Sequence, residues 1–160
     1  MIRKIALGTL AVGALLAATV PAAEAATTKT THVSPNASVT VLAKALHCTH
    51  VKVQKKGSGD DFVPPKHEIT CKSPSGPLDI ATWASHAKMQ RDFKQLGAFM
   101  TLLFPGTPFY VDAGNRWAIV DNDNNNLSTK AKVKAESAYS KKVATRVHKK
   151  VGGTLVVIGG

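Results

Sequence analysis

Residues 78–104, LDIATWASHAKMQRDFKQLGAFMTLLF, decide the fold class of this chain. The first part, 78–84, alternates between two sets of side chains and predicts a strand with two different faces. Ser85 follows as a helix N-cap, and the apolar side chains after it recur at helical spacing. That apolar stripe consists of Met89, Phe93, Leu96, Met100 and Leu103. The stretch therefore predicts a strand followed by a helix from His86 to about Phe104, with the stripe in the core.

The same patterns extend outward in both directions. The other predicted elements are a short helix from Ser38 to about Cys48, strands at 50–54 and 67–72, hairpin strands at 109–112 and 116–121, a helix at 128–151 and a strand at 154–158. The last strand, TLVVI, is a continuous apolar run, which predicts burial on both faces. This order predicts an α+β sandwich with a single domain and a mainly antiparallel sheet. We expect the two long helices to pack on one face of the sheet, beside a short N-terminal helix.

The N-terminus has the three parts of a secretory signal peptide. A basic start precedes an uncharged apolar stretch at 5–20, and an Ala-x-Ala cleavage pattern ends at Ala25. An apolar stretch of about 16 residues is short for a membrane span, which favours cleavage over a retained anchor. We therefore expect residues 1–25 to be removed, 26–37 to form a flexible lead and 38–160 to form the domain. The mature protein is then secreted, extracellular or associated with the cell wall, without stable membrane insertion.

Cys48 and Cys71 are the two cysteines, and both lie in the exported part. An oxidising compartment favours a disulfide, which would close a loop of about 24 residues and contribute about 3 kcal/mol. The alternative is a zinc or copper site, because His47 and His50 flank Cys48. The spacing differs from the usual zinc-ligand pairs, so we favour the disulfide and expect no metal and no other cofactor.

The chain is strongly basic, with a formal net charge of +11. One broad face of the helix at 128–151 carries many of these cations: Lys130, Lys134, Lys141, Lys142, Arg146 and Lys149. Such a face predicts binding to an anionic cell-wall polymer or another polyanion. The competing interpretation is a solvated helix face that only keeps the protein soluble.

Two further patterns suggest chemistry. The segment DNDNNN at 121–126 is similar to the start of a calcium loop, but Asn126 and Lys132 stand where that loop needs Gly and Glu. A polar turn is therefore favoured there. No catalytic motif is present, so a non-enzymatic exported binding domain is the leading hypothesis. The alternative is a small secreted hydrolase-like enzyme whose site gathers distant residues around His47, His50 and His67.

The arrangement of four segments resembles a known group of proteins. These segments are LAKALHC, ITCK, LDIATWASHAKMQRDFKQL and GNRWAIVD. Together they resemble small secreted actinobacterial proteins of uncharacterised function, over roughly residues 38–158. The resemblance implies the disulfide and the α+β fold, and it implies no activity and no functional residues.

Overall fold

The computed structural model describes residues 32–54, 65–123 and 129–160. The expected signal peptide at 1–25 lies outside the described residues. The described part contains, in chain order, α1 (Val39–Ala45), β1 (Thr49–Val53), β2 (His67–Ser73), β3 (Gly76–Thr82), α2 (His86–Leu103), β4 (Phe109–Ala113), β5 (Trp117–Asp121), α3 (Lys130–Val151) and β6 (Thr154–Ile158). This is the predicted order of helices and strands. No helix of these described ranges is long and apolar enough to cross a membrane.

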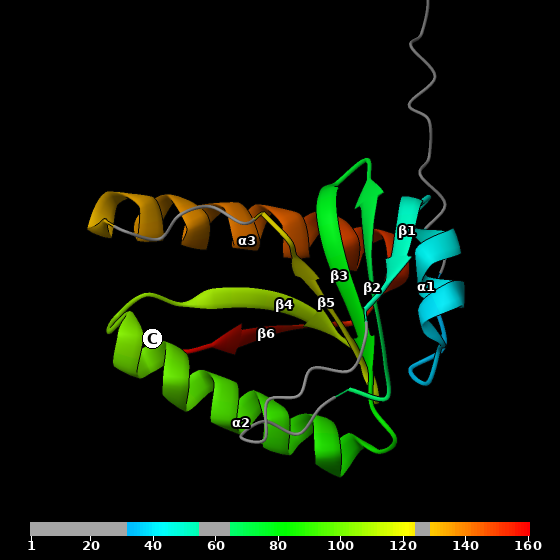
Figure 1. The fold of residues 1–160 in the computed structure, drawn as a ribbon, viewed down its shortest axis with the longest axis horizontal. Helices are drawn as coiled ribbons and strands as arrows, with labels where there is room; N and C mark the ends of the chain where they lie inside the picture. The colour runs from blue at the N-terminus through cyan, green and yellow to red at the C-terminus, as the bar shows by residue number, and fades with distance from the viewer. Residues whose placement is uncertain (1–31, 55–64, 124–128) are drawn as a thin grey trace, which may run out of the picture.

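The six strands form one antiparallel sheet in the order β1-β2-β3-β5-β4-β6 (Figure 1). The first three strands follow one another along the sheet, and β4 and β5 form the predicted hairpin. Strand β6 returns after α3 and pairs with β4, so it lies at one edge of the sheet while β1 lies at the other. The prediction of an α+β fold with an antiparallel sheet is confirmed.

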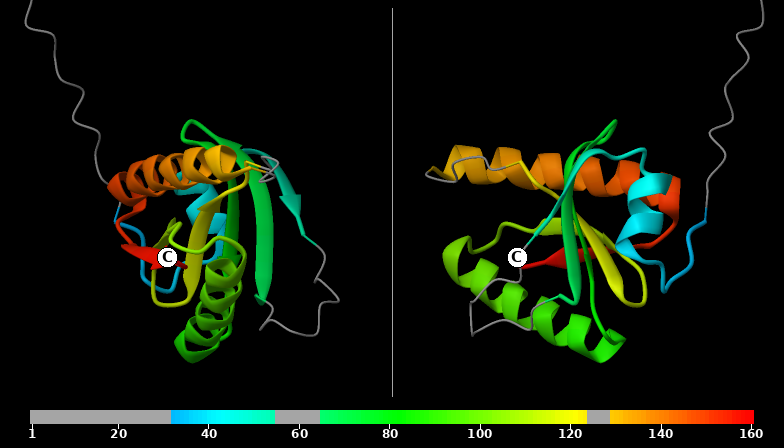
Figure 2. Two further views of the ribbon diagram at one scale, coloured as in Figure 1. Left: turned by 90° about the vertical axis from the view of Figure 1, so that its left-hand side faces the viewer. Right: turned by 45° about the vertical axis from the view of Figure 1, so that its right-hand side comes forward.

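Two hydrophobic cores lie on opposite faces of the sheet, and each has its own helices. Leu78 and Ile80 of β3 point into the first core, which α1 and α3 cover. Val147 of α3 lies in the same core. Ala81 points the other way, to a core that Met89 of α2 enters. Figures 1 and 2 show α3 and α2 on either side of the sheet. The prediction that both long helices pack on one face is therefore wrong, because the central strands are apolar on both faces and each face needs a cover.

Described residues before the predicted domain boundary at Ser38 also pack on the domain. The backbone N–H of Val33 donates to the carbonyl of Val151 at 3.0 Å, and that of Asn115 donates to the carbonyl of Pro35 at 2.8 Å. Ala37 is buried in the core beneath α1 and α3. The described end of the predicted flexible lead, residues 32–37, thus packs against the domain instead of linking to it.

Strand β6 is also less buried than its sequence suggests. Val156 and Ile158 face the core on the α2 side. On the other face, Leu155 is 41% exposed and Val157 is 54% exposed. The prediction of burial on both faces is wrong, because an apolar run predicts two covered faces only for a central strand and β6 is an edge strand.

The disulfide prediction is confirmed: Cys48 and Cys71 are bonded, with their Cα atoms 5.6 Å apart. Cys48 follows α1 and Cys71 lies in β2. The bond therefore fastens the end of α1 to the sheet, next to the first core.

The apolar stripe of α2 packs on the second core from Met89 to Met100. Ser85 caps the helix as predicted, its side chain accepting from the backbone N–H of Lys88 at 3.3 Å. Met89 is buried, and Phe93 is half-buried in an edge-to-face contact with Trp83 at 5.8 Å between ring centres. Leu103, at the end of the stripe, is exposed. Leu96 and Met100 also pack against the core, so within the described structure the stripe leaves it only at its last residue.

The half-burial of Phe93 sets the expected cost of removing it. We expect Phe93→Ala to lower the free energy of unfolding by about 1–3 kcal/mol in denaturant melts, less than the about 3–5 kcal/mol of a fully buried ring. Leu102→Ala, on the same helix at a position that is 79% exposed, is the control and should cost less than about 1 kcal/mol. Equal losses for the two variants would show that α2 is packed differently.

Candidate anion-binding surface

Helix α3 presents the predicted basic face to solvent. Its valines at 143, 147 and 151 are buried in the first core, which fixes the rotation of the helix. Five of the six predicted cations are consequently exposed: Lys134, Lys141, Lys142, Arg146 and Lys149. Lys130 is the first residue of the helix, but its side chain lies outside what the structure describes. The N-cap is Thr129, whose side chain accepts from the backbone N–H of Lys132.

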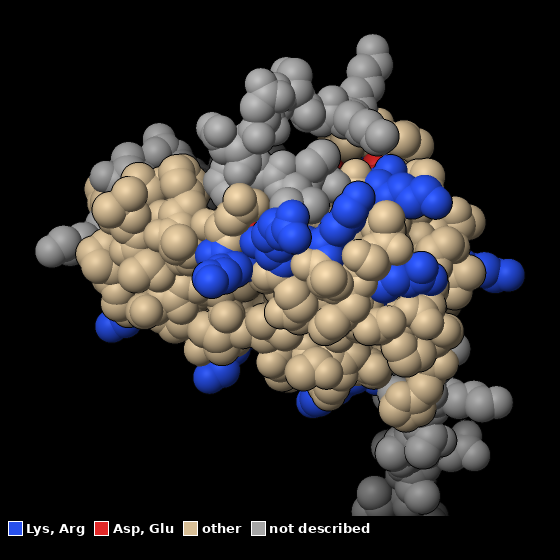
Figure 3. Space-filling view, turned by 90° about the horizontal axis from the view of Figure 1, so that it is seen from below, with Lys and Arg blue, Asp and Glu red and all other residues tan. Residues whose placement is uncertain are grey.

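Further exposed cations, which the sequence analysis did not single out, lie on α3 and on α2, the helix that covers the opposite face of the sheet. Lys132 of α3 is exposed, and so are Lys88, Arg91 and Lys94 of α2. Figure 3 views the molecule from the side on which α2 lies, and lysine and arginine side chains form a row across it. The α2 cations could have been found from the sequence, because all three fall outside the apolar stripe of that helix.

Most carboxylates of the described residues are buried or half-buried. The described residues include seven Asp and Glu side chains, of which Asp123 is the one that is exposed. The other six are buried or half-buried: Glu68, Asp79, Asp92, Asp112, Asp121 and Glu136. By contrast, thirteen lysines and arginines of the same described ranges are exposed. The surface that a ligand meets is therefore more positive than the net charge alone suggests.

Burial raises the pKa of several of the internal aspartates. Desolvation raises the pKa of Asp79 and of Asp112 from 3.8 to about 6 in each case. Two main effects raise the pKa of Asp121 to about 7. The larger is desolvation, and the smaller is the adjacent Glu136 carboxyl. A carboxyl group in such surroundings is partly neutral close to pH 7. This further reduces the negative charge that opposes the exposed cations.

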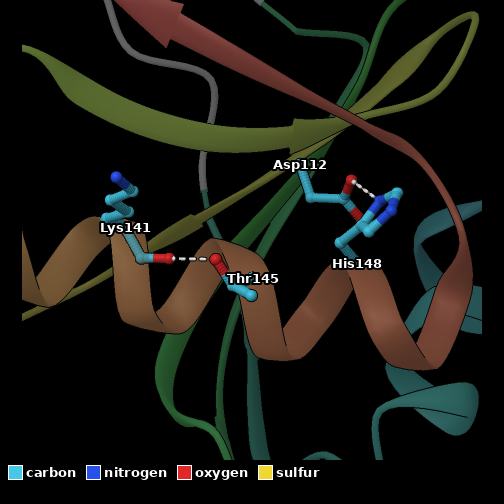
Figure 4. Close-up of polar contacts among 4 residues, drawn as sticks. All are labelled: Asp112, Lys141, Thr145 and His148. Atoms are coloured by element: carbon cyan, nitrogen blue, oxygen red, sulfur yellow. Dashed lines mark hydrogen bonds and ion pairs between the residues drawn. The ribbon is translucent and has the colours of Figure 1, made fainter.

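Asp112 and His148 connect the sheet to α3 (Figure 4). Asp112 is fully buried in β4, and its Oδ1 lies 3.4 Å from Nδ1 of His148. Its Oδ2 has no hydrogen-bond partner among the described residues. Gly153 is required beside this carboxylate, since a Cβ there would lie 2.5 Å from Oδ1. The contact orients the imidazole and holds the end of α3 on the sheet.

A histidine held by a buried carboxylate is also part of hydrolase active sites. Within the described ranges, however, no Ser, Thr or Cys side chain hydrogen bonds to His148. Ser75 lines the same hollow as His148, but no hydrogen bond joins the two side chains in the described structure.

The cations converge where α3 ends. An open hollow of about 710 Å³ lies there, and five basic side chains line it: His32, Arg146, His148, Lys149 and Lys150. Pro74 and Ser75 from the β2–β3 turn form another part of its wall. The positive charges in the last turn of α3 also stabilise the helix, because they face the negative end of its dipole. Basic side chains from the end of α3 therefore gather around this open hollow.

The structure does not assemble the alternative site around the histidines at 47, 50 and 67. His50 lies in β1 near the pairing of Thr49 with Lys72, whereas His67 begins β2 at the other end of the β1–β2 pair. Both cysteines are in the disulfide and cannot act as metal ligands. Across the described residues, no group of three or more His, Cys, Asp or Glu side chains could hold a metal ion.

The calcium-like segment at 121–126 lies partly outside the described residues, which end at Asp123 on this side of the gap. Asp121, its first residue, lies beside Glu136 of α3. These two carboxyl groups come together only through the packing of α3 on β5, so the sequence alone does not show them as a pair.

Comparison with known proteins adds no assignment: no family model, no curated protein and no solved structure matches this chain.

Proposed function

We propose that this chain is an exported, non-enzymatic binding domain that contacts anionic cell-envelope polymer through the basic face of α3. The observation that carries this proposal is the separation of charge. Exposed cations follow α3 and α2, while the described carboxylates other than Asp123 are buried or half-buried. Repulsion of a polyanion by exposed carboxylates is thereby small, and attraction by lysine and arginine acts over the whole helix face.

The secondary structure suits an extended ligand. Helix α3 runs over 22 residues, so its cations form a long, rigid row instead of one deep site. Long lysine and arginine side chains neutralise successive phosphates or carboxylates and release their counterions. We expect such binding to depend strongly on salt and weakly on the sequence of the polymer.

The place of action is part of the same proposal. The signal peptide predicted at 1–25 and the Cys48–Cys71 disulfide both favour an oxidising compartment outside the cytoplasm. We include in the proposal the kinship to small secreted actinobacterial proteins that the sequence suggests. Anionic polymers of the cell wall are then the polyanions within reach.

A charge-reversal variant tests the basic face. We expect Lys134, Lys141 and Arg146, each changed to Glu, to weaken retention on heparin and binding to purified cell wall at least about tenfold. All three side chains are exposed, so circular dichroism and thermal unfolding should change little. On a duplex DNA probe, the wild type should show a slope of about −3 in log affinity against log salt if three or four phosphates are neutralised.

The matched control reverses three other exposed cations, Lys44, Lys52 and Lys72 to Glu. This variant has the same net charge as the first, but its changes lie on α1, β1 and β2. We expect it to retain most of the binding. If both variants lose binding equally, only net charge matters; if neither does, the basic face serves solubility and the proposal is wrong.

A further inference from the structure

The two edge strands of the sheet differ in how they are protected. Strand β1 has a register shift between Thr49 and Lys52, with His50 between them at a φ of 52°, and it carries the charge of Lys52. Bulges and edge lysines are the usual devices that prevent other strands from pairing with an edge. The edge at β1 is thus protected in the ordinary way.

Strand β6 has none of these devices. Its sequence, TLVVI at 154–158, contains no charge and no proline, and it pairs with β4 residue by residue without a register shift. Within the described part of the chain, β4 is the one strand that pairs with it. The backbone N–H and C=O groups on the opposite edge of β6 therefore have no strand partner among the described residues. Unpaired edges of this kind normally promote aggregation. An edge of this kind is suited to receive another strand.

Both faces of β6 offer sites for the side chains of an added strand. On the α3 side, Leu155 and Val157 are exposed. On the α2 side, a groove of about 340 Å³ runs between α2 and β6, and its lining includes Gly97, Ala98 and Val156. The helix comes close to the strand here, since a Cβ added at Gly97 would lie 3.7 Å from the backbone nitrogen of Gly159. Small side chains at 97 and 98 keep the groove open.

The charges beside β6 are positive on both faces. Lys94 lines the groove on the α2 side. On the α3 side, the Nζ of Lys141 lies 5.4 Å from the centre of the Tyr110 ring, and Tyr110 is the register partner of Val157. Within the described ranges, Asp123 is the one exposed carboxylate, and it follows β5 instead of β6. An incoming strand with acidic side chains would be attracted, whereas a second copy of this chain would bring like charges together.

We propose that the β6 edge binds an extended acidic peptide segment of a partner protein by strand addition. The backbone of β6 supplies hydrogen bonds, and alternate side chains of the peptide enter the groove or cover Leu155 and Val157. Lys94 and Lys141 attract the acidic side chains of the peptide. This surface lies next to the row of exposed α3 cations and overlaps with it at one residue, Lys141.

Fluorescence anisotropy with labelled peptides tests the proposal. The probes are three eight-residue peptides in which Glu alternates with Val, Leu or Phe, and three matched peptides with Lys in place of Glu. At least one acidic peptide should bind, and none of the Lys peptides should. Its affinity should fall at least about tenfold in Val157→Glu, which places a negative charge on the edge. Val51→Glu, an exposed valine on the protected edge strand β1, is the matched control and should leave the affinity unchanged.

Three results would overturn the proposal. One is the absence of binding by all three acidic peptides, and another is an equal loss in Val51→Glu. The third is a concentration-dependent dimer of the wild type that Val157→Glu dissociates, which would make a second copy the occupant. Heparin retention separates this proposal from the proposed function, because Val157→Glu should retain it and the triple reversal on α3 should not.

Discussion

Replacing Trp117 with alanine should lower the free energy of unfolding by about 3–5 kcal/mol, the range for a fully buried large aromatic residue. Trp117 is 0% exposed and belongs to the core between the sheet and α3. Its indole N–H donates to the carbonyl of Ser34 at 3.2 Å, so it also holds the first described residues on the sheet. Gly114 and Gly153 both pack against the ring, where a Cβ at Gly153 would lie 2.7 Å from Cη2.

Chemical denaturation of the purified protein measures this loss, and Trp117→Phe is the matched control. Phenylalanine keeps an aromatic ring in the core but leaves the carbonyl of Ser34 without its donor, so we expect a smaller loss of about 1–3 kcal/mol. A loss below about 1 kcal/mol for Trp117→Ala would mean that the ring is not in the core. Equal losses for the two variants would mean that the hydrogen bond matters more than the volume.

The sequence predicted the local features of this fold well, because they depend on neighbouring residues. The alternation at 78–84 fixed which side of β3 each residue faces, and Ser85 marked the start of α2. The arrangement of strands in the sheet is not local. The apolar run of β6 therefore predicts burial on both faces, although β6 pairs only with β4 among the described residues and is an edge strand. For the same reason, the sequence analysis wrongly predicts that α2 and α3 pack on one face of the sheet.

The candidate surface could also be predicted from the sequence only in part. Helical spacing alone predicted the exposed face of α3, because the cations and the buried valines occupy different sides of one helix. The internal carboxylates could not be predicted, since each depends on a partner far along the chain. Asp112 lies beside His148, and Asp121 beside Glu136. The low negative charge of the surface is therefore a property of the tertiary structure.

The contact between Asp121 and Glu136 should make stability depend on pH. Burial, followed by the hydrogen bond and the charge of Glu136, raises the pKa of Asp121 from 3.8 to about 7. Because the folded state then holds the proton more tightly than the unfolded state, folding is favoured at low pH by this group. The contribution is lost as the pH rises from about 4 to about 7. Asp79 and Asp112, whose pKa values are also raised, act in the same direction up to about pH 6.

We therefore expect the unfolding free energy of the wild type to fall by at least about 2 kcal/mol between pH 5 and pH 8. Asp121→Asn keeps a polar side chain of similar shape without the charge, so it should resemble the protonated form. Denaturant melts should show it close to the wild type at pH 5 and about 1–3 kcal/mol more stable at pH 8.

The control is Asp123→Asn, an exposed carboxylate two residues away, which should change the pH dependence much less. Parallel pH curves for Asp121→Asn and the wild type, or a loss of stability in Asp121→Asn at pH 8, would show that Asp121 is ionised and stabilised by its surroundings. The carboxylates would then add more negative charge than proposed, and the cations of α3 would act against a stronger opposing field.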